Sequence, residues 1–365
     1  LQLDNLLPRH LNGTININNL QIATAKEIIP FDTIQLTAKD SANQQYLTLS
    51  GLFGSLDASG NYDYTKISSS IQSLVQYHLQ PDTIKTKTLA DSSHQTLQLA
   101  ASLKWPVSFQ KIAPDLSMPQ PFLLQMHLNS DSNLLTAQWK LPVIKYGDLK
   151  IDSLNGNIKI NSDSLLSDIV LQRLYYPKFP LRKTSLHIAA AKGIVNGDIL
   201  LLDRKQRPGF QLGATFSMLG DQKYSLQLHQ NLLLNKQHWN VPADNIIKID
   251  NGKLNEADLV LKNGNQQLAV TSQPRQGSDV PDIQVKINDF KLANITGFIS
   301  SDTLLADGLL QANATIKNWE QSPLINADVS IDSLKLENIA VGNLTLQAKN
   351  NTASSYNINL GLKGS

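Results

Sequence analysis

The sequence contains no cysteine, which excludes disulfide bonds, thiolate metal sites and a cysteine nucleophile. It also lacks an excess of charge of either sign, because 32 basic residues stand against 30 acidic ones and leave a formal charge of +2. A dedicated nucleic-acid binder would carry a clustered basic surface, so we do not expect one here. The chain nowhere approaches the ~18 consecutive apolar residues of a membrane-spanning helix.

Recognisable catalytic signatures are missing as well. The sequence has no G-x-S-x-G, no P-loop and no G-x-G-x-x-G motif, so hydrolase and nucleotide-binding functions have no starting point. The histidines show no metal-ligand spacing, and we interpret them as solvent-facing residues: His10, His78, His94, His127, His187, His229 and His238. We therefore expect a protein that is not an enzyme and that holds neither a metal ion nor another cofactor.

The sequence does contain sustained alternation of apolar and polar residues. Phe122, Leu124, Met126 and Leu128, for example, occupy every second position of one run. Such alternation predicts strands with one apolar and one wetted face. We expect these strands to be antiparallel and joined by turns at Asn12–Gly13, Asn155–Gly156, Asn196–Gly197, Asn251–Gly252, Asn263–Gly264 and Asp307–Gly308.

Helical patterns are few. Apolar spacing predicts one helix over 68–79, with serines available as N-caps and Pro81 as its stop, and a weaker pattern covers 289–298. Aromatic residues make up only 6% of the chain. We expect the four tryptophans at the rims of the sheet, where an indole N–H stays hydrated: Trp105, Trp139, Trp239 and Trp319.

Two stretches of the sequence resemble each other. "LKIDSLNGNIKI" at 149–160 and "LKLENIAVGNLTL" at 334–346 align with a single insertion, and the likeness extends over about 113–165 and 299–351. We interpret this as an internal repeat, although any all-β chain produces some such matches by chance. Because no linker-like segment divides the sequence, we expect residues 1–365 to be one continuous repetitive segment of a longer chain.

Two-faced strands must hide their apolar face. The inward residues are mostly aliphatic and often small, which favours an all-β fold with one elongated antiparallel sheet curled around an apolar groove and with one or two short helices. Tandem β-sandwiches and a β-helix rod are the alternatives. We expect the groove to be lined by Leu97, Leu99, Leu103, Phe122, Leu124, Met126, Leu128, Leu149, Ile151, Ile158, Ile160, Phe210, Leu212, Phe216, Leu259, Leu261, Ile283, Val285, Ile287, Leu310, Ile316, Leu334, Leu336, Leu344, Leu346, Ile358 and Leu360.

Residues 238–272 ("HWNVPADNIIKIDNGKLNEADLVLKNGNQQLAVTS") and their continuation through 282–350 resemble the TamB family of envelope proteins, within the wider AsmA-like group and most closely its Bacteroidetes-type members. The resemblance implies a periplasmic β-groove (a "β-taco") that shields phospholipid acyl chains between the inner and outer membranes. It also implies an inner-membrane anchor on the parent chain and an outer-membrane barrel of the TamA/BamA type as partner. Neither the anchor nor a barrel-docking region is recognisable in these residues.

Three hypotheses for the function follow. The first is a periplasmic bridge segment whose groove carries phospholipid. The second is a module for outer-membrane protein assembly that pairs client strands with a sheet edge and works with a partner barrel. The third is a secreted adhesin or rod with a dry interior. A carbohydrate-active enzyme ranks last, since paired carboxylates such as Asp302 and Asp307 are flanked by turn residues.

Overall fold

The computed structural model describes residues 2–5, 11–23, 28–41, 44–81, 94–177, 180–278, 280–299, 305–319, 323–352 and 355–364. Every strand pairing among these residues is antiparallel. The fold is all-β, with open, curled antiparallel sheet and short helices, which confirms the expected class. A β-helix rod requires parallel strands and is therefore excluded for the described residues.

The chain divides into two units, which we describe one at a time. The first unit comprises Leu1–Pro177 and Arg182–Lys192, and the second comprises Lys178–Leu181 and Gly193–Ser365. The boundary between β11 and β12 falls at a tight turn, Lys192–Gly193, rather than at a linker.

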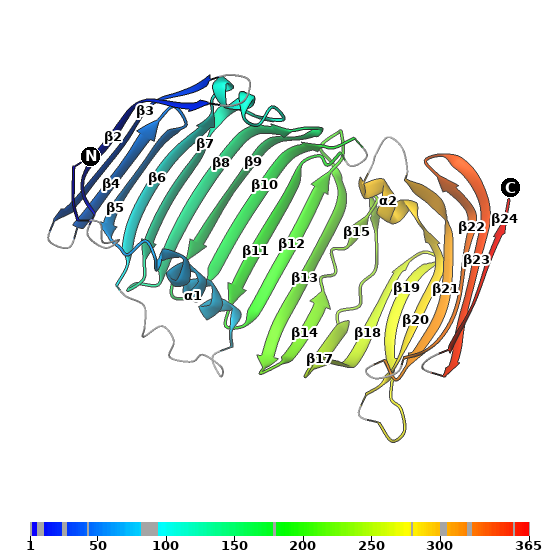
Figure 1. Ribbon diagram of the computed structural model, residues 1–365. Coiled ribbons are helices and arrows are strands. Elements are labelled where there is room, and N and C mark those ends of the chain that lie inside the picture. Colours follow the sequence, from blue (N-terminus) through cyan, green and yellow to red (C-terminus); the bar gives the residue numbers. More distant parts are fainter. Residues whose placement is uncertain are drawn as a thin grey trace. The chain divides into compact units, whose positions relative to one another are not determined.

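In the first unit each strand pairs with the next one along the chain (Figure 1). A helix, α1 (Ile67–Leu79), connects β5 to β6, and the 3-10 helix η2 (Val107–Lys111) connects β6 to β7. The strands are β1 (Gln2–Asn5), β2 (Asn12–Ala23), β3 (Ile28–Ser41), β4 (Gln44–Gly51), β5 (Gly54–Asn61), β6 (Thr96–Trp105), β7 (Leu116–Asn129), β8 (Leu134–Tyr146), β9 (Leu149–Ile160), β10 (Leu165–Tyr175) and β11 (Thr184–Ala191).

The second unit follows the same plan with one departure. The short hairpin of β15 and β16 leaves the main order, so that β14 pairs with β17 and β15 pairs back with β13. A helix, α2 (Ala293–Ile299), connects β20 to β21. The strands are β12 (Ile194–Leu202), β13 (Pro208–Gly220), β14 (Lys223–Leu228), β15 (Leu233–Leu234), β16 (Gln237–His238), β17 (Ile246–Asp250), β18 (Lys253–Asn263), β19 (Gln266–Gln273), β20 (Asp282–Lys291), β21 (Ala306–Lys317), β22 (Leu324–Leu336), β23 (Ile339–Thr352) and β24 (Ser355–Lys363).

The pairing register places apolar side chains opposite one another across neighbouring strands. In the first unit Leu97 of β6 lies opposite Leu128 of β7, and Leu99 lies opposite Met126. Because side chains of a strand alternate between the two faces, these residues share one face, which we call the apolar face. The face that carries Gln98 is the polar face. The same division holds in the second unit, where Leu268 lies opposite Ile287 on the apolar face.

Helix α1 packs on the apolar face of the first unit. Its buried residues Ser70, Leu74 and His78 recur every four positions and therefore lie on one side of the helix. The helix contacts β8 and β11, and Figure 1 shows it crossing the strands near their ends. We call residues that lie opposite one another across successive strands a register row. The register row at this end of the strands is only 0–8% exposed: Leu97, Leu128, Leu135, Ile160, Leu165 and Ala190.

The expected helix over 68–79 is confirmed by α1. It ends where the residue before Pro81, Gln80, is forced into an extended conformation. The expected serine cap is wrong, because Lys66 occupies the N-cap position and makes no side-chain cap bond. In the weaker pattern over 289–298, helix begins only at Ala293, and Asp289 belongs to β20.

The core of the second unit is built around Trp239, which is 2% exposed. Its ring lies 5.6 Å from that of Phe290, and Leu232, Val241 and Leu261 complete the buried cluster. The segment that carries β15 and β16 therefore covers part of the apolar face. The expectation of a hydrated N–H group is wrong for Trp105, Trp239 and Trp319, since their Nε1 atoms are buried without a described hydrogen-bond partner.

Only some of the expected turns are turns. Asn251–Gly252 and Asn263–Gly264 connect strands, whereas the other four Asn–Gly or Asp–Gly pairs lie inside β2, β9, β12 and β21. At Gly156 the reason is steric: a Cβ would lie 2.1 Å from the Trp139 ring, which occupies that space. The glycine at position 156 thus marks close approach of a neighbouring ring, and the dipeptide alone does not separate this from a turn.

The two similar sequence stretches do not occupy equivalent positions. Residues 149–160 form the single strand β9, whereas residues 334–346 span the end of β22, a turn and the start of β23. What recurs is the tetrapeptide Ile-Asp-Ser-Leu, at 151–154 and 331–334. Its serine has a positive φ in both places, 56° at Ser153 and 53° at Ser333. The shared sequence therefore marks a local irregularity near the strand ends.

We expect α1 to be held on the apolar face by Leu74, which is 2% exposed. Replacing it with Ala removes buried methyl groups and leaves a cavity, so Leu74→Ala should lower the free energy of unfolding by about 2–5 kcal/mol. Urea unfolding of the full chain measures the change. Gln72→Ala, on the exposed side of the same helix, should stay within about 0.5 kcal/mol of wild type. Equal effects of the two substitutions would contradict this packing.

Candidate functional site

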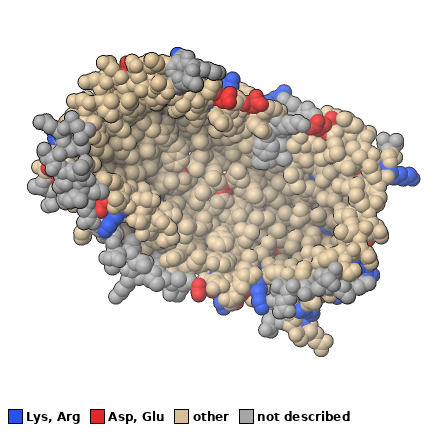
Figure 2. Space-filling model, in the orientation of Figure 1, with Lys and Arg blue, Asp and Glu red and all other residues tan. Residues whose placement is uncertain are grey.

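The apolar face of the first unit is built from register rows that contain no charged residue. One row joins Leu56, Ala101, Leu124, Trp139 and Gly156 across β5 to β9. Its neighbour joins Ala58, Leu99, Met126, Ala137 and Ile158. Figure 2 shows this face hollowed over the first unit, with Lys, Arg, Asp and Glu mainly along its margins. The sequence forms this surface because its apolar residues keep one parity along each strand.

Most of the expected lining residues of the first unit share this face. Leu97, Leu99, Leu103, Phe122, Leu124, Met126, Leu128, Ile158 and Ile160 all lie in its register rows. Leu149 and Ile151 have the opposite parity on β9 and lie beyond Ser153, whose positive φ interrupts the alternation. They are not part of these rows.

The apolar face of the second unit has the same construction. One row joins Leu259, Val270, Val285, Ala314, Ala327, Ala348 and Ile358, and the next joins Leu261, Leu268, Ile287, Ala312, Val329, Leu346 and Leu360. Ile283 and Ile316 lie opposite each other in a third row. Leu310 and Leu344 both lie opposite Ile331, which places these three residues in a fourth row. Phe210, Leu212 and Phe216 share one side of β13. Leu334 and Leu336 lie beyond Ser333 and, like Leu149 and Ile151, leave the alternation.

Parts of this surface are covered by the protein itself. Leu97, Leu128 and Ile160 lie in the buried row beneath α1, and Leu261 belongs to the Trp239 core, against which Leu310 also packs. At Leu97, Leu128, Ile160 and Leu261, which are 0–6% exposed, the protein itself occupies the space that a ligand would need, whereas Leu310 is only partly buried.

Other parts of the surface remain accessible. Leu212 is 41% exposed and Phe216 is 40% exposed, although both belong to the apolar side of β13. In β24, Ile358 and Leu360 are more exposed still. Large apolar side chains gathered on one face and open to solvent are typical of a binding surface.

The polar face carries shallow hollows that sequence reasoning missed. In the first unit, hollows of about 720 and 650 Å³ lie over a row formed by Asp57, Ala100, Gln125 and Gln138. A hollow of about 640 Å³ lies over Asn313, Asp328 and Gln347 in the second unit. The only sequence signal was the Gln, Asn and Asp residues that alternate with the apolar set. These hollows offer amides and carboxylates, which can form hydrogen bonds, beside aliphatic carbon such as that of Leu123 and Val170.

Three histidines each contact an aspartate: His94 with Asp131, His187 with Asp168, and His229 with Asp198. His229 also lies 2.9 Å from the hydroxyl oxygen of Thr215, which gives a hydroxyl–imidazole–carboxylate series on the polar face of the second unit. Gly213 makes room for it, since a Cβ there would lie 2.3 Å from both Asp198 Oδ1 and His229 Nδ1.

Two observations argue against nucleophilic catalysis by this series. Thr215 donates its hydroxyl hydrogen bond to Asn196 at 2.7 Å, so the proton is not directed at the imidazole. The backbone around Thr215 is regular strand paired with β12 and β14, which leaves no free pair of N–H groups to stabilise an oxyanion. His10 and Asp302 lie outside the described residues. Among those described, no three His, Asp or Glu side chains form a metal-binding group.

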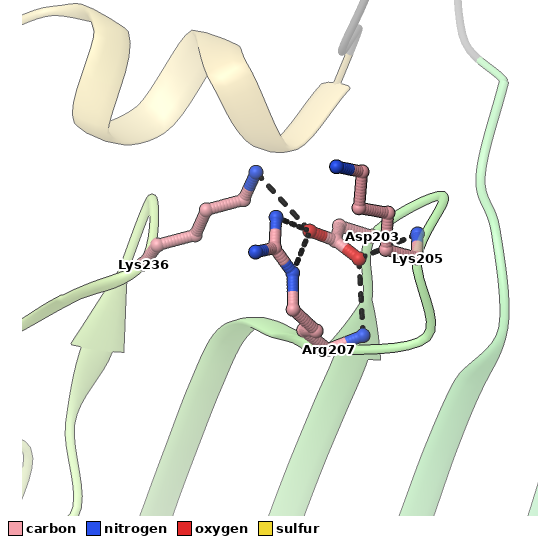
Figure 3. A network of polar contacts seen from close by, with 4 residues as sticks. All are labelled: Asp203, Lys205, Arg207 and Lys236. Atoms are coloured by element: carbon pink, nitrogen blue, oxygen red, sulfur yellow. Dashed lines mark hydrogen bonds and ion pairs between the residues drawn. The ribbon is translucent and has the colours of Figure 1, made fainter.

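The turn between β12 and β13 holds a network of polar contacts around one carboxylate (Figure 3). The Asp203 carboxylate accepts backbone N–H bonds from Lys205 at 2.8 Å and Arg207 at 3.0 Å. The Arg207 guanidinium donates to it at 2.9 and 3.1 Å, and the Lys236 ammonium lies 3.2 Å away. The Arg207 backbone N–H, followed by the two cationic side chains, holds the pKa of Asp203 well below its usual range.

No protein-family model, curated protein or solved structure matches this chain. None of the helices in the described residues is long and apolar enough to cross a membrane. The resemblance to the TamB family therefore stays a prediction from the sequence.

The lowered pKa of Asp203 makes a prediction about acid stability. A carboxyl whose folded pKa is depressed contributes stability above its unfolded pKa of about 3.9 and loses it as the pH falls towards the folded value. Asp203→Asn should therefore lower the melting temperature at pH 7. The gap between variant and wild type should narrow as the pH falls below about 4. Thermal unfolding followed by circular dichroism from pH 7 to pH 2 measures both. A gap that stays constant with pH would contradict the role of the ionised carboxylate.

Proposed function

We propose that this chain is a periplasmic bridge segment that shields phospholipid acyl chains on its apolar faces during transport between membranes. The observation that carries the proposal is the combination of uncharged register rows with exposed large side chains such as Leu212 and Phe216. A soluble protein rarely leaves such a surface open unless another molecule covers it. The family resemblance supports the same proposal independently.

The energetics favour an acyl chain that stays on the apolar face but can still slide along it. Each methylene removed from water contributes about 0.8 kcal/mol, so a chain of about 16 carbons would gain roughly 13 kcal/mol by staying on the face. Escape into water would therefore be slow. Sliding between neighbouring rows would cost little, because each row offers similar aliphatic contacts. A headgroup held at the open side would remain hydrated and avoid the cost of burial.

The proposed mechanism is binding of phospholipid without any chemical reaction. The apolar rows would hold acyl chains, and the direction of transport would come from other parts of the system. We place the segment in the periplasm, on a parent chain anchored in the inner membrane, with an outer-membrane barrel of the TamA/BamA type as its partner. These assignments rest on the resemblance alone.

Leu124 provides the test, because it lies on the apolar face two rows away from the residues beneath α1. Its neighbour Gln125 is exposed on the polar face of the same strand. The wild-type chain, purified without detergent, should carry phospholipid that native mass spectrometry detects. Leu124→Arg should reduce the bound lipid by about tenfold or more, because the charge must lose water when an acyl chain covers it.

Gln125→Arg is the matched control, since it adds the same charge to the same strand on the opposite face. It should retain lipid at the wild-type level. A wild-type protein without lipid, or equal loss in both variants, would overturn the proposal. Circular dichroism should first show that both variants are folded.

A second candidate function is favoured by β24, which among the described strands pairs only with β23. An edge that has no partner among the described residues can add a strand through backbone hydrogen bonds, whether from a client protein or from a continuation of the same chain. Leu360 is 70% exposed on this strand, so an added strand would also bury apolar surface. These features suit a module that assembles outer-membrane proteins.

The two functions respond to different substitutions. Asn359→Pro removes a backbone donor from the edge strand and should reduce crosslinking of β24 to unfolded outer-membrane protein severalfold, while leaving bound phospholipid unchanged. Leu124→Arg should do the reverse. Photo-crosslinking from position 361 measures the first effect, and loss of lipid without loss of crosslinking in Asn359→Pro would contradict strand addition.

A further inference from the structure

The turn between β12 and β13 concentrates positive charge. It contains Lys205 and Arg207, and Lys236 joins them from the turn between β15 and β16, around the carboxylate of Asp203. The turns at 221–222, 251–252 and 263–264 of the same unit contain no cation. These three cations and one carboxylate give a net charge of about +2, which is a local feature and does not reflect the composition of the chain.

The carboxylate orders the Arg207 and Lys236 side chains without using up their donors. The Asp203 side chain is 11% exposed, whereas those of Arg207 and Lys236 are 60% and 52% exposed. Arg207 uses two N–H groups on Asp203, and a guanidinium has five. Figure 3 shows the Lys205 ammonium near the same cluster, with no contact drawn to it. The result is a fixed group of outward N–H donors with excess positive charge, which suits a phosphate anion.

The cluster lies at the end of an exposed apolar strip. On β13, Phe210, Leu212 and Phe216 follow Arg207 on the apolar face. At about 3.4 Å per residue, Leu212 lies about 17 Å along the strand from Arg207. The hydrocarbon layer of one membrane leaflet is about 15 Å thick, so an acyl chain attached to a phosphate at the turn would pass over Phe210 and end near Leu212.

We propose that this turn binds the phosphate group of a phospholipid of net negative charge while the acyl chains lie along β13 over Phe210 and Leu212. The inference rests on the proposed lipid-binding function and adds to it a place and a charge preference for the headgroup. The same chemistry would also bind a free phosphate ester, and the test separates the two sources.

The test compares ligands with identical acyl chains on the full-length protein. Short-chain phosphatidylglycerol, used below its micelle concentration, should bind at least about fivefold more tightly than the matching phosphatidylcholine, with each basic residue contributing about fivefold. Glycerol phosphate, which lacks acyl chains, should bind at least tenfold more weakly. Isothermal titration calorimetry measures all three, and added salt should reduce the preference.

Two lysines in similar surroundings, one at the proposed site and one away from it, allow a mutational test with a matched control. Lys236 lies 3.2 Å from Asp203 and is 52% exposed, and Lys223 lies 3.2 Å from Asp250 and is 55% exposed, near the opposite end of β13. Lys236→Gln and Lys205→Gln should each weaken phosphatidylglycerol binding by about fivefold and change phosphatidylcholine binding by less than twofold. Lys223→Gln should change neither.

The possible outcomes distinguish this inference from the function on which it rests. Equal binding of the two lipids, or equal effects of Lys236→Gln and Lys223→Gln, overturns the headgroup site and leaves the acyl-binding surface standing. Glycerol phosphate bound as tightly as phosphatidylglycerol overturns the lipid as the source of the phosphate. Absence of binding by either lipid overturns both the headgroup site and the proposed function.

Discussion

The antiparallel hydrogen-bond ladder is the constraint from which the other properties of each unit follow. It fixes which residue lies opposite which, and a shift of one residue would turn the apolar side chains of a strand to the opposite face. Because neighbouring strands share their register rows, a strand such as β7 is held from both sides by Leu99 and Ala137 around Met126. An uncharged surface extending over many strands therefore needs no special pocket. It arises from one rule of alternation applied to each strand.

The same surface serves as core in some places and stays open in others, and the difference lies in what covers it. Leu128 and Leu124 belong to the same strand and the same face, yet Leu128 is fully buried in the row beneath α1 and Leu124 is not. In the second unit the Trp239 cluster closes part of the face, and Leu212 remains exposed. A packed core and an exposed apolar surface thus both arise from one pattern. The sequence alone could not distinguish covered from exposed parts of the face, because the residues that cover it are distant along the chain.

The fold class, the first helix and most of the shared faces were predictable because alternation and helical spacing are local signals. The errors came from residues whose meaning depends on distant neighbours. Asn155–Gly156 reads as a turn until the Trp139 ring is seen to lie where a Cβ would be. Trp239 reads as a rim residue until Phe290 is found beside it. The cationic cluster escaped notice because Lys236 joins Arg207 only through the pairing of β15 with β13. The likeness between the two halves encoded a strand irregularity at Ser153 and Ser333.

The contact between Trp139 and Gly156 has a consequence for the breadth of the apolar surface. The indole fills the space above a residue that has no side chain, so the largest ring of the middle rows lies low against the sheet. Any β-carbon at position 156 would push that ring outward, into the volume above the neighbouring leucines. A single methyl group added at position 156 would therefore reduce the free space above the centre of the first unit. The depth of the apolar surface there can thus change without any change in the register of a strand.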